Sequence, residues 1–402
     1  MMRLAASLIL LSCVAVGAQT KPDPALLEEI EQIRAIDNHA HPGRVLGPGE
    51  KEDNEIDALM SFAAPTFENY APPLRLQPDN PEWVQAWRAL YGYRYNDNKP
   101  EHVAELLRTK QKIMHEQGDN YANWVLDRLG IETMVANRIA LGRGLQPPRF
   151  VWVAFDDALL FPLDNSRAKG KNSDLKGFYQ DEEALRRRYL TESGLQQPPA
   201  KFDDYLRQVV TATLERQRKQ GAIAIKFEAA YLRSLAFDEA AEADARHVYE
   251  ANIGGSTPTD SDYKTLQDFI FRYMAREAGR VGMAVHFHVA GGGVGTYYHA
   301  PGGDPMLLAS AFEDPTLHHT NFVIVHGGEP WQREVRALLA KPNVYAIFRR
   351  RRFSITHGIS PQRCACGWSG IRKRSCSART PAPARRRWAG RSRAGSRRTP
   401  RA

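Results

Sequence analysis

Cysteine is scarce in this chain of 402 residues. Its four cysteines are Cys13, close to the start, and Cys364, Cys366 and Cys376, close to the end. Residues 19–348 contain none, which excludes a disulfide framework and a thiolate metal site from that part of the chain. Any metal ion held there must be bound by histidine, carboxylate or modified lysine.

Long apolar runs are scarce too. The run from Leu4 to Val16 is too short to span a bilayer. It follows a short basic start and precedes a cleavage site of small residues that ends at Ala18. This pattern predicts a signal peptide over residues 1–18, and therefore a secreted or periplasmic protein without a membrane span. A lipoprotein anchored through Cys13 is the minor alternative.

Acidic residues are missing from residues 349–402, which contain 16 Arg and one Lys. The whole chain has 55 basic and 46 acidic groups, so removing these 17 leaves 38 basic groups and a net charge of −8 for residues 1–348. The formal net charge of +9 therefore belongs to the tail. A basic tail is a feature of nucleic-acid-binding proteins, which makes such a protein one alternative.

The composition of the tail favours another origin, because Arg, Ser, Pro, Ala and Gly without apolar periodicity are typical of GC-rich DNA read in the wrong frame. Codons for residues 368–381 can be chosen so that the reading from each third base gives Glu-Trp-Tyr-Pro-Glu-Lys-Val-Leu-Phe-Gly-Thr-Asp-Ala. The first two bases of most codons leave no choice. We predict a frameshift near residues 346–349, in the gene or in its reading, and a disordered, non-native tail. A natural disordered tail is the alternative.

Short apolar runs alternate with helical patterns between the two ends. Strands are expected at 33–41, 131–136, 150–155, 222–228, 283–289, 322–328 and 344–348. Helices are expected at 81–91, from 100 onward, and at 121–129, 202–220, 263–278, 305–312 and 331–339, whereas 162–200 looks loop-rich. This alternation predicts a parallel sheet covered by helices, with a helical insertion at about 43–120.

The number of strands indicates which parallel fold this is. No glycine-rich phosphate-binding fingerprint follows an early strand, which disfavours a doubly wound sheet. Seven strand-helix units instead predict an α/β fold of the (β/α)8 TIM-barrel type whose eighth strand is missing. We expect residues 19–348 to form this single incomplete barrel.

Polar side chains gather at the predicted carboxyl ends of the strands, where such barrels keep their active sites. They are His39 and His41, Lys226 and Glu228, His286 and His288, and His326. Alternate residues of a strand share a face, so the two members of each pair point the same way. Imidazoles that project together can close on one metal ion, and the set predicts a metal site.

This combination resembles the amidohydrolase superfamily. The resemblance lies in three motifs: His-Ala-His at the end of the first strand, the histidine at the end of the fifth strand, and Val-His-Gly-Gly at the end of the sixth strand. The chain is most similar to the amidohydrolase-related branch, which includes metal-dependent hydrolases and decarboxylases. The resemblance extends from about Ile33 to Phe348.

The resemblance implies roles for the site residues. His39, His41 and His288 would bind a divalent ion, most simply one Zn²⁺, and His286 is the weaker candidate ligand. His326 would bind a second metal ion or orient the substrate. Lys226 would be a carboxylated bridging ligand or, as we favour, a cation for a substrate carboxylate. Glu228 is a structural candidate, and Arg138, Tyr297 and Tyr298 are candidates for the pocket wall.

The implied activity is hydrolysis of a C–N or ester bond of a small organic substrate by a metal-activated water. Non-oxidative decarboxylation is the alternative. The family also requires an Asp at the end of the eighth strand, as metal ligand or general base, and no residue after Phe348 supplies one. An inactive remnant is therefore a further alternative. We expect no specific nucleic-acid partner, and oligomerisation remains open.

Overall fold

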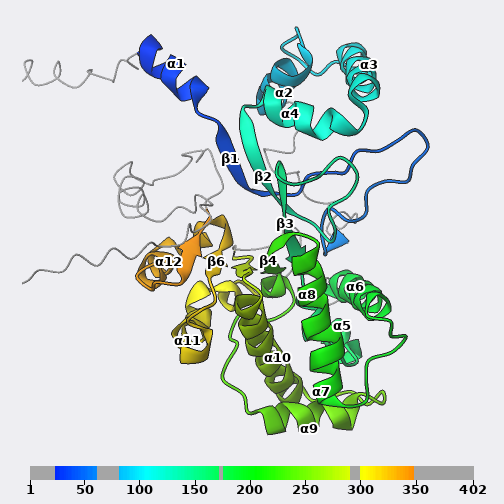
Figure 1. The fold of residues 1–402 in the computed structure, drawn as a ribbon, viewed down its shortest axis with the longest axis vertical. Coiled ribbons are helices and arrows are strands. Elements are labelled where there is room, and N and C mark those ends of the chain that lie inside the picture. Colours follow the sequence, from blue (N-terminus) through cyan, green and yellow to red (C-terminus); the bar gives the residue numbers. More distant parts are fainter. Residues whose placement is uncertain (1–22, 61–80, 172–174, 290–298, 348–402) are drawn as a thin grey trace, which may run out of the picture.

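The computed structural model describes residues 23–60, 81–171, 175–289 and 299–347 (Figure 1). Several predicted features lie outside the described residues: the signal peptide with its cleavage after Ala18, Tyr297 and Tyr298, and the tail at 349–402. Among the residues that are described, no helix is long and apolar enough to cross a bilayer.

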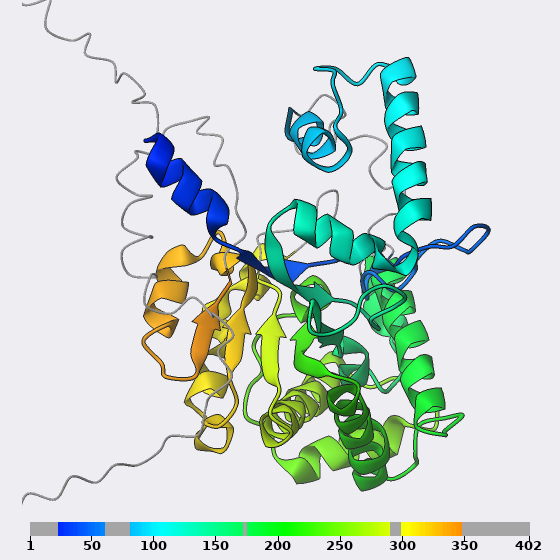
Figure 2. The same ribbon diagram turned by 45° about the horizontal axis from the view of Figure 1, so that its top comes forward.

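Seven parallel strands form one sheet in which each strand pairs with the next along the chain. They are β1 (Ala35–Ala40), β2 (Ile131–Asn137), β3 (Phe150–Phe155), β4 (Ala222–Phe227), β5 (Ala284–Phe287), β6 (Phe322–Ile324) and β7 (Val344–Ala346). The sheet curls toward a barrel (Figure 2). Within the described ranges it lacks an eighth strand and β7 does not pair with β1. The predicted incomplete barrel is confirmed.

Helices connect the strands and cover the sheet. The α-helices are α1 (Pro24–Gln32), α2 (Pro81–Tyr91), α3 (Pro100–Gln117), α4 (Tyr121–Arg128), α5 (Ser166–Lys171), α6 (Lys176–Glu192), α7 (Phe202–Asp204), α8 (Ala212–Lys219), α9 (Glu242–Asn252), α10 (Asp260–Arg280), α11 (Ala309–Glu313) and α12 (Gln332–Leu338). Shorter helical turns are η3 (Gly118–Asn120), η4 (Asp157–Leu160), the π-helical η6 (Tyr205–Thr211), η7 (Ala229–Tyr231), η8 (Ala300–Gly303), η9 (Pro305–Leu308), η10 (Pro315–Leu317) and η11 (Val325–Gly328).

The stretch 162–200, expected to be loop-rich, contains α5 and α6, so that expectation was wrong. Helix α6 buries one apolar side, which includes Phe178, Leu185 and Tyr189. Charged residues surround these positions in the sequence and obscure the helical spacing. Tertiary packing of this side against the core stabilises the helix despite its weak amphipathic pattern.

The core lies between the sheet and the helices, and β3 to β7 are buried almost throughout. At its centre the ring of Phe287 contacts the rings of Phe227 and Phe271, at centroid distances of 5.9 and 5.6 Å. Burial of each such ring contributes about 1.5–3 kcal/mol to folding. This packing fixes the strand ends that carry the site.

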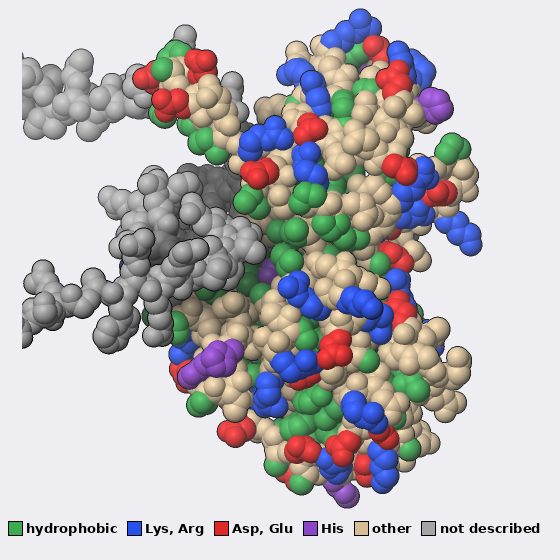
Figure 3. Space-filling view, in the orientation of Figure 1, with side chains coloured by type: hydrophobic (Ala, Val, Ile, Leu, Met, Phe, Trp, Pro, Cys, Tyr) green, Lys and Arg blue, Asp and Glu red, His purple; other side chains and the backbone are tan. Residues whose placement is uncertain are grey.

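Strands β1 and β2 are less buried, and β1 is an edge strand of exposed and half-exposed residues. Ile33 and Ile36 remain 69% and 41% exposed. Helices α2 to α4 stand beside the β1–β2 edge, apart from the main helical layer (Figure 1). The face in Figure 3 mixes basic and acidic side chains, in keeping with the modest negative charge of residues 1–348.

Candidate functional site

Four histidines from three distant parts of the chain meet at the carboxyl ends of the strands. His39 lies near the end of β1 and His41 just beyond it, His288 follows β5, and His326 lies in η11 after β6. The ring centroids of His39 are 5.2 Å from those of His41 and 5.0 Å from those of His326. The rings of His288 and His326 are 4.7 Å apart. The curl of the sheet therefore brings the end of β1 close to the turn that follows β6.

His326 reaches this position through an unusual backbone. Strand β6 ends at Ile324, earlier than predicted, and His326 follows it with a φ of 63°. A positive φ is rare for a residue with a side chain and costs about 1–3 kcal/mol, which the surrounding structure must offset. The turn is held by Gly327, whose N–H donates to the carbonyl of Ile347 at 2.7 Å. It places Nε2 of His326 3.2 Å from Nδ1 of His288.

Lys226 and His286 form a second, deeper layer. They are register partners on the adjacent strands β4 and β5, and both are buried. Nζ of Lys226 lies 3.3 Å from Oε1 of Glu228 and 5.5 Å from the ring centroid of Phe155. Burial and the positive charge of Lys226 lower the pKa of His286 to about 3. His286 is therefore neutral at physiological pH.

The upper histidines are held neutral as well. Burial, with the nearby Lys226 and other histidines, lowers the pKa of His39 far below its usual range. Burial and the neighbouring His326 do the same to the pKa of His288. Neutral imidazole is the form that binds a metal ion. The donor chemistry of the site therefore suits a divalent cation.

Unpartnered nitrogen atoms support the same fit. Nδ1 of His39, Nδ1 of His286 and Nε2 of His288 are buried without a hydrogen-bond partner in the described structure. A buried polar atom without a partner costs about 1–3 kcal/mol, which a bound ligand would remove. In the described ranges, however, no three His, Cys, Asp or Glu side chains are already arranged around one point as a metal site. The donors fit an ion, but their coordination sphere is incomplete.

Two acidic residues, Asp57 and Glu228, extend the site from His41. Asp57 was not identified from the sequence. Nδ1 of His41 lies 3.1 Å from Oδ2 of Asp57, which belongs to the segment after β1. A side-chain hydrogen bond links Asp57 to Glu228. Burial opposes ionisation of Asp57, but the hydrogen bond and charge of His41 prevail and lower its pKa to about 2. Asp57 has no periodic pattern around it that would have identified it.

Near the site lies a group of buried carboxyls, which we call the acid layer: Asp156, Asp157, Glu182 and Glu228, the last of which lies 3.3 Å from Nζ of Lys226. Burial raises the pKa of Asp156 to about 7 and, with the charge of Asp156, that of Asp157 to about 8. Burial and neighbouring carboxyls raise those of Glu182 and Glu228 well above the usual range. Asp156 and Asp157 directly follow β3, a position that could have identified them from the sequence.

Arg138, a candidate for the pocket wall, has a different position. Its guanidinium is fully buried and forms a two-pronged ion pair with Asp53, at 2.9 and 3.1 Å. It also donates to the carbonyl oxygens of Pro42 and Ala140. These bonds tie the segment after β1 to the end of β2, so Arg138 is a structural residue.

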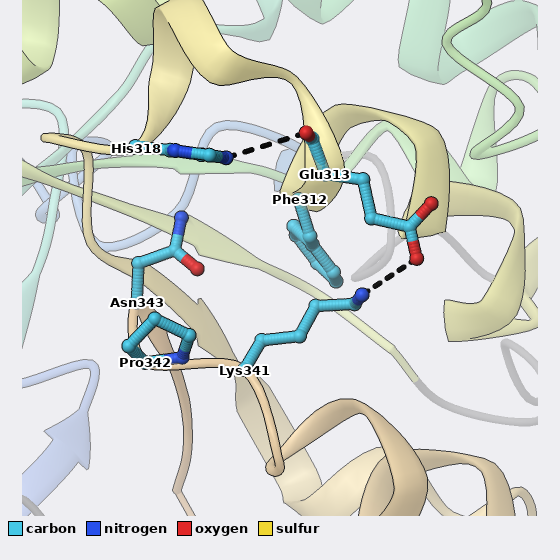
Figure 4. Close-up of a pocket in the computed structure, with 6 residues that line it drawn as sticks. All are labelled: Phe312, Glu313, His318, Lys341, Pro342 and Asn343. Atoms are coloured by element: carbon cyan, nitrogen blue, oxygen red, sulfur yellow. Dashed lines mark hydrogen bonds and ion pairs between the residues drawn. The ribbon is translucent and has the colours of Figure 1, made fainter.

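A separate pocket lies at the opposite, amino-terminal end of β7 (Figure 4). Its lining residues are Phe312, Glu313, His318, Lys341, Pro342 and Asn343. An ion pair of 2.6 Å joins Lys341 to Glu313, and Nε2 of His318 lies 3.3 Å from the carbonyl oxygen of Glu313. The pocket shares no residue with the histidine site.

Comparisons with known proteins give distant structural likenesses only. No known protein family and no curated protein matches the chain. Among solved structures, a uronate isomerase from Thermotoga maritima is 14% identical over 72% of this chain, with a TM-score of 0.44. A glucuronate isomerase from Caulobacter crescentus is 12% identical over 68%, with a TM-score of 0.47. A candidate metal-dependent hydrolase from Lactobacillus casei is 14% identical over 57%, with a TM-score of 0.39.

The chain spans 61%, 57% and 54% of the lengths of these three proteins, in that order. Likenesses at this level carry no functional argument. The functional assignment therefore rests on the histidine site itself.

Proposed function

We propose that this chain derives from a metal-dependent hydrolase of the amidohydrolase-related family, which cleaves a C–N or ester bond of a small organic substrate. The observation that carries the proposal is the row of contacting rings His41, His39, His326 and His288 at the carboxyl ends of three strands. Burial holds His39 and His288 neutral, as metal ligation requires.

In this proposal His39, His41 and His288 bind one divalent ion, most simply Zn²⁺. His286 is the alternative ligand. When bound, such an ion supplies a water whose pKa is lowered to about 7 and polarises the substrate.

His326 and Lys226 have roles toward the substrate. His326 lies between the rings of His39 and His288, where it can hold or move a proton at Nε2 or orient the scissile group. Lys226 brings a positive charge to the floor of the site and would attract a substrate carboxylate. Its partner Glu228 lies 3.3 Å away, and burial raises the pKa of that carboxyl well above its usual range, which disfavours a negative charge beside Lys226.

We further propose that residues 349–402 result from a frameshift and that the unshifted frame encodes the eighth strand with its terminal Asp. Two observations support this. The described sheet has two free edges, β1 and β7, although His39 on the first strand already touches His326 after the sixth. The alternative reading of residues 368–381 ends in Gly-Thr-Asp-Ala. Without that Asp the chain is expected to be inactive as it stands.

A test of the metal site compares His39→Ala and His41→Ala with His247→Ala, an exposed histidine on α9. Zinc is titrated into each metal-free protein against a chromophoric competitor. We expect the first two variants to lose at least about 10-fold in zinc affinity, since each removes a ligand, and the control to match the parent. Equal affinity in all four proteins would refute the assignment of the ligands.

The reaction itself is tested on a chain with the restored frame. Hydrolysis of amides or esters, with a dependence on added Zn²⁺, is the expected activity. Release of CO₂ from carboxylate substrates without hydrolysis would instead identify a decarboxylase.

A further inference from the structure

The segment after β1 returns to the site and brings one carboxylate to His41. Nδ1 of His41 lies 3.1 Å from Oδ2 of Asp57 and 3.0 Å from the carbonyl oxygen of Ile56. Both neighbours are hydrogen-bond acceptors, so Nδ1 must be the nitrogen that carries the proton. The lone pair of His41 is then on Nε2, the nitrogen that remains available to a metal ion.

Asp57 is itself held from two sides. Its Oδ1 accepts a hydrogen bond from the N–H of Leu59 at 2.9 Å, and Leu59 is fully buried. The carboxyl of Glu228 forms a side-chain hydrogen bond with Asp57, and Oε1 of Glu228 lies 3.3 Å from Nζ of Lys226. A chain of side chains therefore runs from His41 at the first strand through Asp57 and Glu228 to Lys226 on the fourth.

The segment has a separate anchor a few residues earlier. Asp53 pairs with the buried Arg138, and its Oδ2 also accepts from the N–H of Arg44 at 2.7 Å. Asp53 is not among the contacts of His41, whose partners are Asp57, Ile56 and neighbouring rings. The two aspartates therefore have different roles: Asp53 anchors the segment, and Asp57 contacts the imidazole of His41.

We propose that Asp57 is a positioning residue that holds His41 in the tautomer with the proton on Nδ1 and presents Nε2 to the metal ion, and that Glu228 and Lys226 hold Asp57 in place. The inference rests on the proposed metal site. A carboxylate behind a metal-binding histidine orients the ring and strengthens it as a donor, and the loss of such a partner costs about 10–100-fold in metal affinity.

The test uses Asp57→Asn, with Glu52→Gln, a change at an exposed acidic residue of the same segment, as the matched control, and Asp57→Ala as a second variant should the first fail to fold. In the metal-free protein labelled with ¹⁵N-histidine, the nitrogen shifts report the tautomer of His41, whose signals are assigned with His41→Gln. We expect the parent and Glu52→Gln to carry the proton on Nδ1. In Asp57→Asn the amide can donate as well as accept, so a substantial fraction should shift to the Nε2-protonated form.

Zinc titration of the same proteins is the second readout. Zinc affinity should fall about 10–100-fold in Asp57→Asn and less than about 3-fold in Glu52→Gln. An unchanged tautomer in Asp57→Asn, or an equal loss of affinity in both variants, would overturn the role of Asp57. If no protein binds zinc, including the parent, the proposed function fails, while the tautomer measurement still decides whether Asp57 orients His41.

Discussion

At the scale of single residues, burial without charge compensation is what sets the chemistry of this site. His39, His286 and His288 are neutral because they are enclosed near Lys226 and one another. The acid layer is enclosed in the same way, so burial raises the pKa of its carboxyls above that of exposed carboxyls. The neutral imidazoles are the part of this arrangement that suits a cation, because a metal ion binds the unprotonated ring nitrogen.

Asp156 provides a test of this electrostatic picture through the pH dependence of stability. Its pKa is about 7 in the folded protein, raised by burial, against about 3.9 in the unfolded chain. Between these values the unfolded state binds fewer protons, so the free energy of unfolding should fall as pH rises from about 4 to about 7. The contribution of Asp156 is present in full below pH 4 and is lost above pH 7.

Replacement of Asp156 by Asn keeps the acceptor of the 2.8 Å hydrogen bond from Gln217 and removes the ionisation. The fall in unfolding free energy over this window should become smaller, by up to about 1.4 kcal/mol per pH unit. Urea unfolding at pH 4.5, 6 and 7.5 measures the free energy of unfolding of the parent and of the Asp156→Asn variant. Asp244→Asn, an exposed change of the same charge, controls for net charge. A slope identical to that of the parent would show that Asp156 ionises freely.

At the scale of secondary-structure elements, the turn η11 requires a glycine at position 328. Gly328 has a φ of 71°, and a Cβ atom there would lie 2.0 Å from Cγ2 of Val335, which is 1% exposed on α12. Neither the backbone nor the short, buried Val335 side chain can easily give way. This glycine allows α12 to pack directly against the turn that presents His326.

Gly328→Ala should therefore destabilise the protein by at least about 2 kcal/mol, from both the strained φ and the collision. Gly254→Ala is the control, since its Cβ would meet nothing within 4 Å and its φ is not positive. Thermal or urea unfolding compares the two variants with the parent. A Gly328→Ala protein as stable as Gly254→Ala would contradict the packing described for η11 and α12.

The elements also show what the sequence could and could not predict. Strands such as β4 and β5 are short, continuous apolar runs, so their positions and their terminal Lys226 and His286 could be read directly. Helix α6 was missed because charged residues interrupt its apolar side, and β6 was predicted too long because a backbone turn at His326 has no apolar signature. Asp57 was missed because only the folded segment after β1, tied down by Arg138, brings it to His41.

At the scale of the whole molecule, the described sheet is a barrel wall with two free edges. Edge strands with exposed apolar residues, such as Ile36 on β1, favour association with other chains. The described part of the site likewise has histidine donors and no complete set of metal ligands. One additional strand ending in an Asp would pair with the free edges of the sheet and would supply the missing metal ligand.

Zinc titration of two proteins tests this account most directly: the chain as it stands, and a chain in which the frame is restored near residues 346–349. We expect about one tightly bound zinc ion per restored chain, lost on substitution of His39 or His41, and at least about 10-fold weaker binding by the unrestored chain, which lacks the Asp ligand. Failure of the restored chain to bind zinc, or equal affinity of both chains, would contradict it.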